Sequence, residues 1–276
     1  MSDAHDADLH GHVELSTVTL SAEFVAAETT ASPDVAEYAL WLGDDSLVLA
    51  QRLGWWISRA PELEEDVALA NIALDLLGHA RSLLRYAGSA TDRSEDDLAY
   101  WRDEQDFLSA HLFEQPNGDF AHTIVRQFAA SHYLFELYER LRASADPVLA
   151  AVAGKAVKEV AYHVDHAHHW VVRLGDGTDE SHARMQAALD AEWPYVEELF
   201  TPVDPGLVGA GIAADPTAFR DAVLERVAKI LDEATLAVPE VTPRLGGGRR
   251  GLHTEDFGYV VAEMQHLARS LPGAKW

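Results

Sequence analysis

The sequence Asp75-Leu-Leu-Gly-His79 places a carboxylate and an imidazole four residues apart, and Glu159-Val-Ala-Tyr-His163 repeats this pattern further along the chain. Both motifs lie inside long apolar segments. Residues i and i+4 share one face of a helix, so each pair points in one direction. Two such helices in one bundle can direct both pairs at a common interior point, which is the layout of a carboxylate-bridged di-iron site. The motifs therefore predict a ferritin-like bundle of long helices.

Helix signals continue along the chain, and strand signals are nearly absent. We expect helices over residues 34–59, 61–86, 94–101, 119–142, 146–174, 181–200, 215–236 and 254–271. The predicted fold class is all-α, a ferritin-like long-helix bundle with additional C-terminal helices.

The N-terminal residues differ in composition from the rest. Residues 1–33 are polar and end in Thr29-Thr30-Ala31-Ser32-Pro33, which predicts a disordered acidic N-terminal tail. Asp34 suits a helix N-cap. We expect residues 34–276 to form a single ferritin-like helical domain.

Composition limits the classes of function. The absence of cysteine excludes thiolate metal sites and cysteine nucleophiles. A formal net charge of −25 repels nucleic acid and anionic lipid. The chain shows no run of about 18 apolar residues, so no membrane span is expected. Its first residues lack the apolar region of a signal peptide, which favours the cytoplasm.

The first half of the predicted metal site departs from the di-iron pattern. A working site takes a Glu from each of two helices and Glu-x-x-His from the other two. Asp44 or Asp45 stands one helix hairpin before Asp75 and can represent the first carboxylate. His79 follows Asp75 at i+4 instead of i+3, a rotation of about 100° around the helix.

The second half departs further. His163 again follows Glu159 at i+4, and the positions from Gln127 to Ser131, where a fourth carboxylate is expected, offer no anion. The sequence therefore predicts no catalytic, cofactor-binding or metal-ligating residue. It predicts a vestigial pocket that contains Asp44, Asp45, Asp75, Glu159 and His163.

Buried carboxylates without metal need another positive charge. Lys155 stands four residues before Glu159, and Lys158 stands beside it. We expect one of these lysines to replace the metal charge in the pocket. The alternative is that both lysines extend to solvent, and that the two Asp/Glu–His motifs are ordinary surface pairs.

Several longer strings add a specific resemblance. They are Leu42-Gly43-Asp44 leading to Leu49-Ala50-Gln51-Arg52-Leu53-Gly54, Leu69 through Gly78, Glu114-Gln115-Pro116-Asn117-Gly118, Lys158-Glu159 through Tyr162-His163, Arg173 through Thr178, and Gly251-Leu252-His253-Thr254-Glu255 through Ala262-Glu263-Met264-Gln265. Together, from about residue 34 to the C-terminus, they resemble the structural, non-catalytic subunit of bacterial phenylacetyl-CoA 1,2-epoxidase, a multicomponent oxygenase of aerobic phenylacetate breakdown.

This resemblance implies a subunit of a monooxygenase complex that has no active site of its own. It implies binding to a related catalytic subunit that carries the di-iron centre, and a small accessory subunit and a reductase as further partners. NADPH, flavin and an iron–sulfur cluster would belong to those partners. A homo-oligomer is an open alternative when the chain is expressed alone.

Aromatic, basic and histidine residues leave further alternatives open. Large apolar area comes from Trp41, Trp55, Trp56, Trp101, Trp170 and Trp193, which suit either the chain's own core or an interface. Arg249-Arg250 beside three glycines suits a CoA phosphate, an acidic partner surface or a solvated flexible loop. The histidines at positions 166, 168 and 169 suit adventitious metal.

Two other functions compete with the subunit role. One is a self-sufficient di-iron oxidase or oxygenase that uses Asp45, Asp75, His79, Glu159 and His163. The other is a ferritin-type storage protein, which requires a hollow homo-oligomer.

Overall fold

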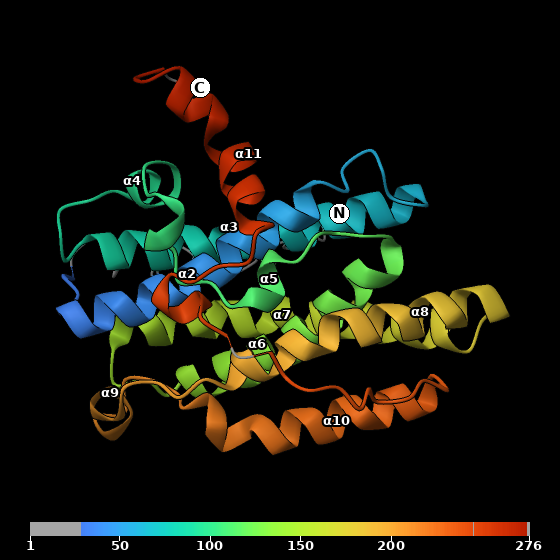
Figure 1. Ribbon diagram of the computed structural model, residues 1–276. Helices are drawn as coiled ribbons and strands as arrows, with labels where there is room; N and C mark the ends of the chain where they lie inside the picture. Colours follow the sequence, from blue (N-terminus) through green and yellow to red (C-terminus); the bar gives the residue numbers. More distant parts are fainter. Residues whose placement is uncertain (1–28, 245, 275–276) are drawn as a thin grey trace, which may run out of the picture.

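The computed structural model describes residues 29–244 and 246–274, so residues 1–28 of the predicted tail lie outside the described part. Within that part the regular structure consists of helices, without strands. The longest are α2 (Pro33–Gly54), α3 (Leu63–Gly88), α6 (Phe120–Leu141) and α7 (Pro147–Gly175). The all-α prediction is confirmed, and these four helices follow the expected ranges closely (Figure 1).

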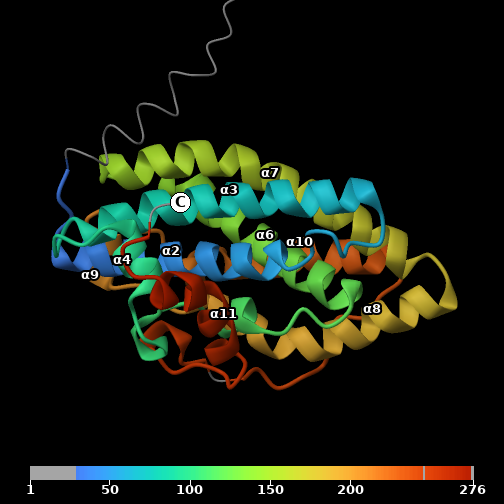
Figure 2. The same cartoon turned by 90° about the horizontal axis from the view of Figure 1, so that it is seen from above.

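The four long helices form the bundle. Short connections join α2 to α3 and α6 to α7, and the two helices of each hairpin pack against each other. Contacts between α3 and α7 then link the two hairpins. Seen from above, α7, α3 and α2 lie side by side in that order (Figure 2).

Capping residues set where these helices begin. The Asp119 carboxylate accepts a hydrogen bond from the His122 N–H at the start of α6, and the Asp146 carboxylate accepts two at the start of α7. At α2 the expected cap is wrong by two positions, since Ser32 holds the N-cap position and Pro33 is the first helical residue.

Helix α3 carries more apolar side chains than it buries against the other helices of the bundle. By length and composition it could cross a membrane, whereas the sequence led us to expect no such segment. Its inner face, with Leu69, Ile72, Leu76 and Leu83, is buried in the bundle. Since 44% of its most apolar window is buried in this way, α3 packs against the bundle on one face and leaves further apolar surface outside.

The predicted additional C-terminal helices are present. They are α8 (Asp179–Glu192), α10 (Arg220–Glu233) and α11 (Phe257–Ser270), of which α8 and α10 lie along α6 and α7 and α11 projects from the body (Figure 1). The helix expected over 181–200 ends early, because a 3-10 segment, η2 (Trp193–Phe200), starts at Trp193-Pro194.

The remaining helices are short. They are α4 (Glu95–Tyr100), η1 (Glu104–Asp106), α5 (His111–Glu114), α9 (Pro205–Gly209), η3 (Pro216–Phe219) and η4 (Gly248–Arg250). Only α4 was predicted as a separate element, and its first turn is fixed by a capping box between Ser94 and Asp97.

Candidate functional site

The two Asp/Glu–His motifs meet across the groove between α3 and α7, and each histidine pairs with the carboxylate of the other helix. His79 Nε2 lies 2.7 Å from Glu159 Oε2, and His163 Nε2 lies 3.1 Å from Asp75 Oδ2. From the sequence, both motifs were expected to point at a common centre. The structure brings the four residues together, but as two separate crossed pairs.

These residues, with Lys155, form the α3–α7 site, which is buried at one end and open at the other. The imidazoles of His79 and His163 are buried. The Asp75 and Glu159 side chains keep 32% and 24% of their surface exposed. The carboxylates therefore face the outside of the bundle, where water lowers the cost of their charge.

Electrostatics match this arrangement. Burial disfavours the charged form of Glu159, but the hydrogen bond and charge of His79 and the charge of Lys155 outweigh burial, so the pKa of Glu159 is lowered. Burial lowers the pKa of His163, although Asp75 opposes this. A neutral His163 with its proton on Nε2 donates to Asp75.

The expected lysine substitute is present in part. Lys155 Nζ lies 3.3 Å from Glu159 Oε1, and the Lys155 side chain is about one-third exposed. Lys158 is exposed and forms no ion pair with a residue in the described part of the chain. The ammonium thus lies at the rim of the site and not among buried carboxylates.

The donor set does not fit a pair of metal ions. A histidine ligand normally donates its second ring nitrogen to an acceptor. Each Nε2 meets this condition, because it is held by a carboxylate, and the buried Nδ1 atoms of His79 and His163 have no partner among the described residues. What is missing is a set of further ligands around them. Across residues 29–244 and 246–274, no group of three or more His, Asp or Glu side chains is arranged to hold a metal ion.

Helices α2 and α6 supply no carboxylate beside His79. Tyr138 of α6 packs edge-on against the His79 ring, with centroids 5.5 Å apart, and its hydroxyl lies 3.5 Å from Ser46 Oγ of α2. Burial raises the pKa of Tyr138 well above its ordinary value, so this hydroxyl stays neutral.

The placement of Asp44 and Asp45 expected from the sequence is wrong. Both are fully buried, but they pair with arginines instead of joining the α3–α7 site. Asp44 Oδ2 accepts from Arg102 Nη1 at 2.9 Å and from the Leu108 N–H at 2.8 Å. Asp45 binds both terminal nitrogens of Arg249 at 2.7 Å. We call these two pairs the arginine anchor.

The anchor also corrects the interpretation of Arg249-Arg250 as a solvated loop. Burial opposes the charge of Arg249, but Asp45 and further acidic groups raise the pKa of this guanidinium. Only Arg250 is exposed. Because its side chain is buried in this ion pair, the Arg249 guanidinium is not available to bind a ligand or a partner at the surface.

Buried glutamates hold the same C-terminal loop in place. Glu198 accepts the N–H groups of Gly247 and Gly248, and Glu114 accepts from His253 Nδ1 and the Thr254 N–H. A Cβ at Gly248 would lie 1.9 Å from the Ser109 carbonyl oxygen. The glycines therefore permit close packing, and the expected flexible loop is a tightly held one.

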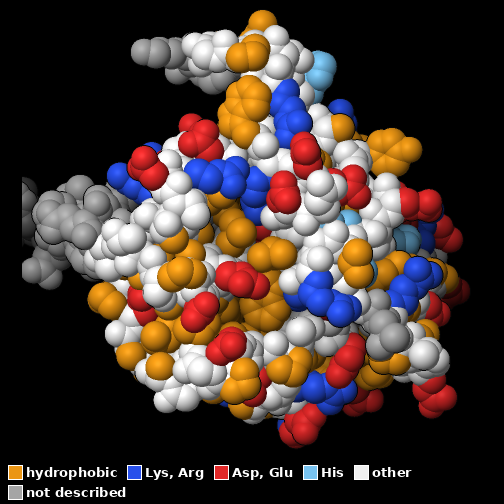
Figure 3. Space-filling model, turned by 60° about the vertical axis from the view of Figure 1, so that its left-hand side comes forward, with side chains coloured by type: hydrophobic (Ala, Val, Ile, Leu, Met, Phe, Trp, Pro, Cys, Tyr) orange, Lys and Arg blue, Asp and Glu red, His pale blue; other side chains and the backbone are white. Residues whose placement is uncertain are grey.

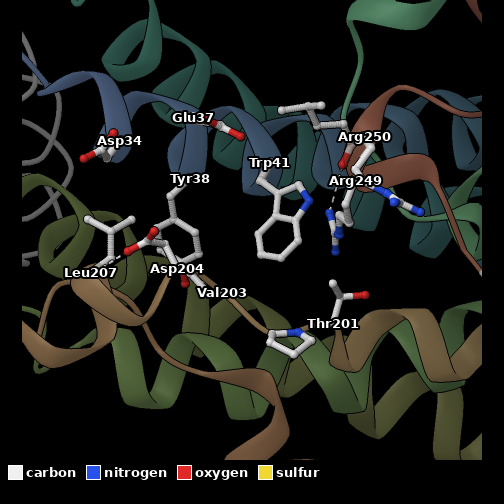
Figure 4. A pocket seen from close by; sticks show the side chains of 12 residues that line it. Asp34, Glu37, Tyr38, Trp41, Thr201, Val203, Asp204, Leu207, Arg249 and Arg250 are labelled. Atoms are coloured by element: carbon white, nitrogen blue, oxygen red, sulfur yellow. Dashed lines mark hydrogen bonds between the residues drawn. The ribbon is translucent and has the colours of Figure 1, made fainter.

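A cavity of about 350 Å³ lies beside the anchor. Its walls include Tyr38, Trp41, Val203 and Leu207, and its rim carries Asp34, Glu37, Asp204 and Arg250 (Figure 4). Apolar and acidic side chains gather on this side of the molecule (Figure 3). The three rim carboxylates repel an anion, so the geometry does not favour a CoA phosphate here.

The additional histidines bind separate carboxylates. His166 Nε2 lies 2.8 Å from Glu65, His168 Nε2 lies 3.4 Å from Glu233, and His169 pairs within its own helix with Asp165. Among the described residues, these imidazoles belong to no group of three or more His, Asp or Glu side chains that could hold a metal ion.

Six of the seven tryptophans, those considered from the sequence, divide between core and surface. Trp56 and Trp170 are buried, Trp41 and Trp193 pack partly against the core, and Trp55 and Trp101 are exposed.

Arg102 and Arg249, the partners of the paired aspartates, were not predicted from the sequence. The available signal was Leu42-Gly43-Asp44-Asp45-Ser46-Leu47, two adjacent carboxylates inside an apolar helix, which require two cations. It does not say which cations, because both arginines lie far away in the chain.

Comparison with solved structures defines the class of fold. An R2-like ligand-binding oxidase variant with a manganese/iron cofactor matches with a TM-score of 0.50 and 13% sequence identity, over 85% of this chain and all of that one. Identity this low supports the fold alone. The protein is a ferritin-like helical bundle, as the sequence predicted.

Sequence comparison then gives the family. The family model described as phenylacetic acid catabolic protein matches residues 22–276. One of the subunits of 1,2-phenylacetyl-CoA epoxidase from Escherichia coli (strain K12) is 49% identical over 242 residues, which cover 87% of this chain and 98% of that protein. The chain therefore belongs to the phenylacetic acid catabolic protein family.

Proposed function

We propose that this chain is the non-catalytic structural subunit of a phenylacetyl-CoA epoxidase complex in aerobic phenylacetate catabolism, and that it works in the cytoplasm. The observation that carries the proposal is the crossed pairing of His79 with Glu159 and His163 with Asp75. Each histidine is bound to one carboxylate of the facing helix, and the described residues bring no third carboxylate or imidazole to them, which favours a chain without a metal pair.

The self-sufficient oxidase is less well supported. It requires Asp45 to act with Asp75, His79, Glu159 and His163. Asp45 instead binds Arg249 through both carboxylate oxygens. Releasing it would leave a buried guanidinium without its counter-charge.

The proposed partners follow from this role. A related catalytic subunit would hold the di-iron centre and the thioester substrate, with a small accessory subunit and a reductase that supplies electrons from NADPH through flavin and an iron–sulfur cluster. This chain would contribute a rigid helical body. No step of the reaction would depend on its own side chains.

The test combines assembly with turnover. The chain is co-expressed with the di-iron subunit encoded in the same operon, and the purified complex is assayed for NADPH-dependent epoxidation of phenylacetyl-CoA. We expect a stable complex, and we expect an Asp75→Asn/Glu159→Gln variant to support the same turnover as the wild type. Failure to co-purify would contradict the partner role, and an intact but inactive variant complex would contradict the non-catalytic role.

A further inference from the structure

Helix α3 carries an apolar stripe on its outer face that no described part of the chain covers. Leu63, Val67, Leu74 and Leu77 are 75%, 54%, 64% and 46% exposed. Ala70 lies between them and completes an alternating spacing of four and three residues. This spacing is the seam of a two-helix coiled coil.

The stripe differs from scattered surface leucines. The opposite face of α3 is already buried against the bundle, so this helix is apolar on two sides, and it is apolar enough to resemble a membrane span. A helix that is apolar all round is normally buried all round. The outer face of α3 is therefore expected to be covered in the working protein.

The stripe is complementary to itself when two copies run antiparallel. About an axis near residue 72, Val67 of one copy lies opposite Leu77 of the other, and Ala70 lies opposite Leu74. Both apolar layers are then repeated by symmetry, as a closed twofold interface requires.

Charge also favours the antiparallel orientation. The first residues of α3 include exposed Glu62 and Glu64, and its last turns include exposed Arg81 and Arg85. Antiparallel pairing places the acidic end of each copy against the basic end of the other, whereas parallel pairing places like charges together.

We propose that two copies of this chain associate through α3, antiparallel, with the twofold axis near residue 72. This goes beyond the proposed function, since it concerns the chain alone. A membrane is a poorer occupant, because the partly exposed carboxylates of Asp75 and Glu159 lie beside the stripe and the chain carries a net charge of −25.

Cysteine cross-linking tests the axis directly, since the natural chain contains no cysteine. Asn71→Cys places two thiols beside the axis, and we expect it to form a disulfide-linked dimer under mild oxidation. Leu63→Cys is the matched control on the same helix: its two thiols would stand about 27 Å apart along the axis at 1.5 Å per residue. We expect no cross-link there, and a Leu63→Cys dimer without an Asn71→Cys dimer would overturn the antiparallel seam.

Sedimentation of the full chain over a concentration series tests the association itself. We expect the wild type at twice the monomer mass, Leu74→Glu at the monomer mass, and Val238→Glu, an exposed apolar control away from α3, at twice the mass. A monomeric wild type, or a dimer that Leu74→Glu leaves unchanged, would overturn the proposal. So would retention of the wild type on anionic vesicles that Leu74→Glu abolishes.

A charge-reversal pair of variants distinguishes a specific loss of the dimer from misfolding of a single variant. Glu64→Arg is expected to weaken the dimer, and Glu64→Arg/Arg81→Glu is expected to restore it, because Arg81 lies opposite Glu64 about the proposed axis, while thermal melts stay unchanged. Binding of the catalytic subunit is measured separately. If that subunit requires the stripe while the chain alone is monomeric, the self-association fails and the proposed function stands.

Discussion

The arginine anchor and the α3–α7 site use the same kind of residue in opposite ways. In the anchor, Asp44 and Asp45 are completely buried, and each faces a guanidinium that matches its charge and its planar geometry. In the α3–α7 site, the carboxylates of Asp75 and Glu159 remain partly in water and meet imidazoles and one rim lysine. The anchor thus neutralises two fully buried carboxylates, whereas the α3–α7 site pairs partly exposed carboxylates with buried imidazoles.

The largest expected effect breaks the anchor. Arg249→Met leaves Asp45 buried without a counter-charge, so we expect a loss of about 3–5 kcal/mol in the free energy of unfolding. Denaturant titration measures it. Arg250→Met is the matched control on the next residue, which is exposed, and it should stay within about 0.5 kcal/mol. Similar losses for both variants would contradict the anchor.

Glu192 is another buried carboxyl, and it contrasts with Asp44 and Asp45. In the described part of the chain it has no arginine at ion-pair distance. Burial raises the pKa of Glu192 to about 7 from 4.5, although the charge of Arg126 opposes this, and Glu192 Oε2 has no partner among the described residues. A raised carboxyl pKa in the folded state means that stability falls as pH rises from about 4.5 to about 7. At 1.36 kcal/mol per pKa unit, the loss is about 3 kcal/mol.

Glu192→Gln tests this carboxyl. We expect the variant to lack the decline and to exceed the wild type in stability at pH 8, as measured by denaturant titration across that pH range. Parallel pH profiles of the two proteins would show that Glu192 is not the group responsible.

A smaller effect is expected in the α3–α7 site. Glu159→Gln weakens a charged hydrogen bond to His79, which corresponds to about 1–2 kcal/mol at neutral pH. The pKa of Glu159 is lowered in the folded state, so the wild type should lose this stabilisation as pH falls through and below 4.5. The variant should show a flatter acid limb in thermal melts, and an unchanged acid limb would rule out the pair.

The smallest effect distinguishes the two lysines. Lys155→Met is expected to cost less than about 1 kcal/mol, since the lysine is at the rim and partly exposed. Lys158→Met, on the same helix, should cost less still. A loss of several kcal/mol at Lys155 would restore the idea of an ammonium that replaces the metal charge inside the pocket.

Sequence predicted the bundle and the residues of α3 and α7, because helix periodicity and capping are local signals. The helix starts predicted at residues 119 and 146 are confirmed, with Asp119 and Asp146 as the caps of α6 and α7. The i+4 spacing at Asp75 and Glu159 also predicted a departure from the di-iron pattern, and this stays a prediction. The partners of the buried charges could not be predicted. The pairing of Asp45 with Arg249, for example, depends on how segments far apart in the chain pack together.

Metal loading tests the central claim most directly. The purified chain is incubated with ferrous iron without oxygen, desalted, exposed to oxygen and analysed for metal content and visible absorption. We expect no stoichiometric iron and no oxo-bridge band, since the described residues bring no group of three or more His, Asp or Glu side chains together at a metal position. Two irons per chain, with a band that disappears in Glu159→Gln, would contradict the account.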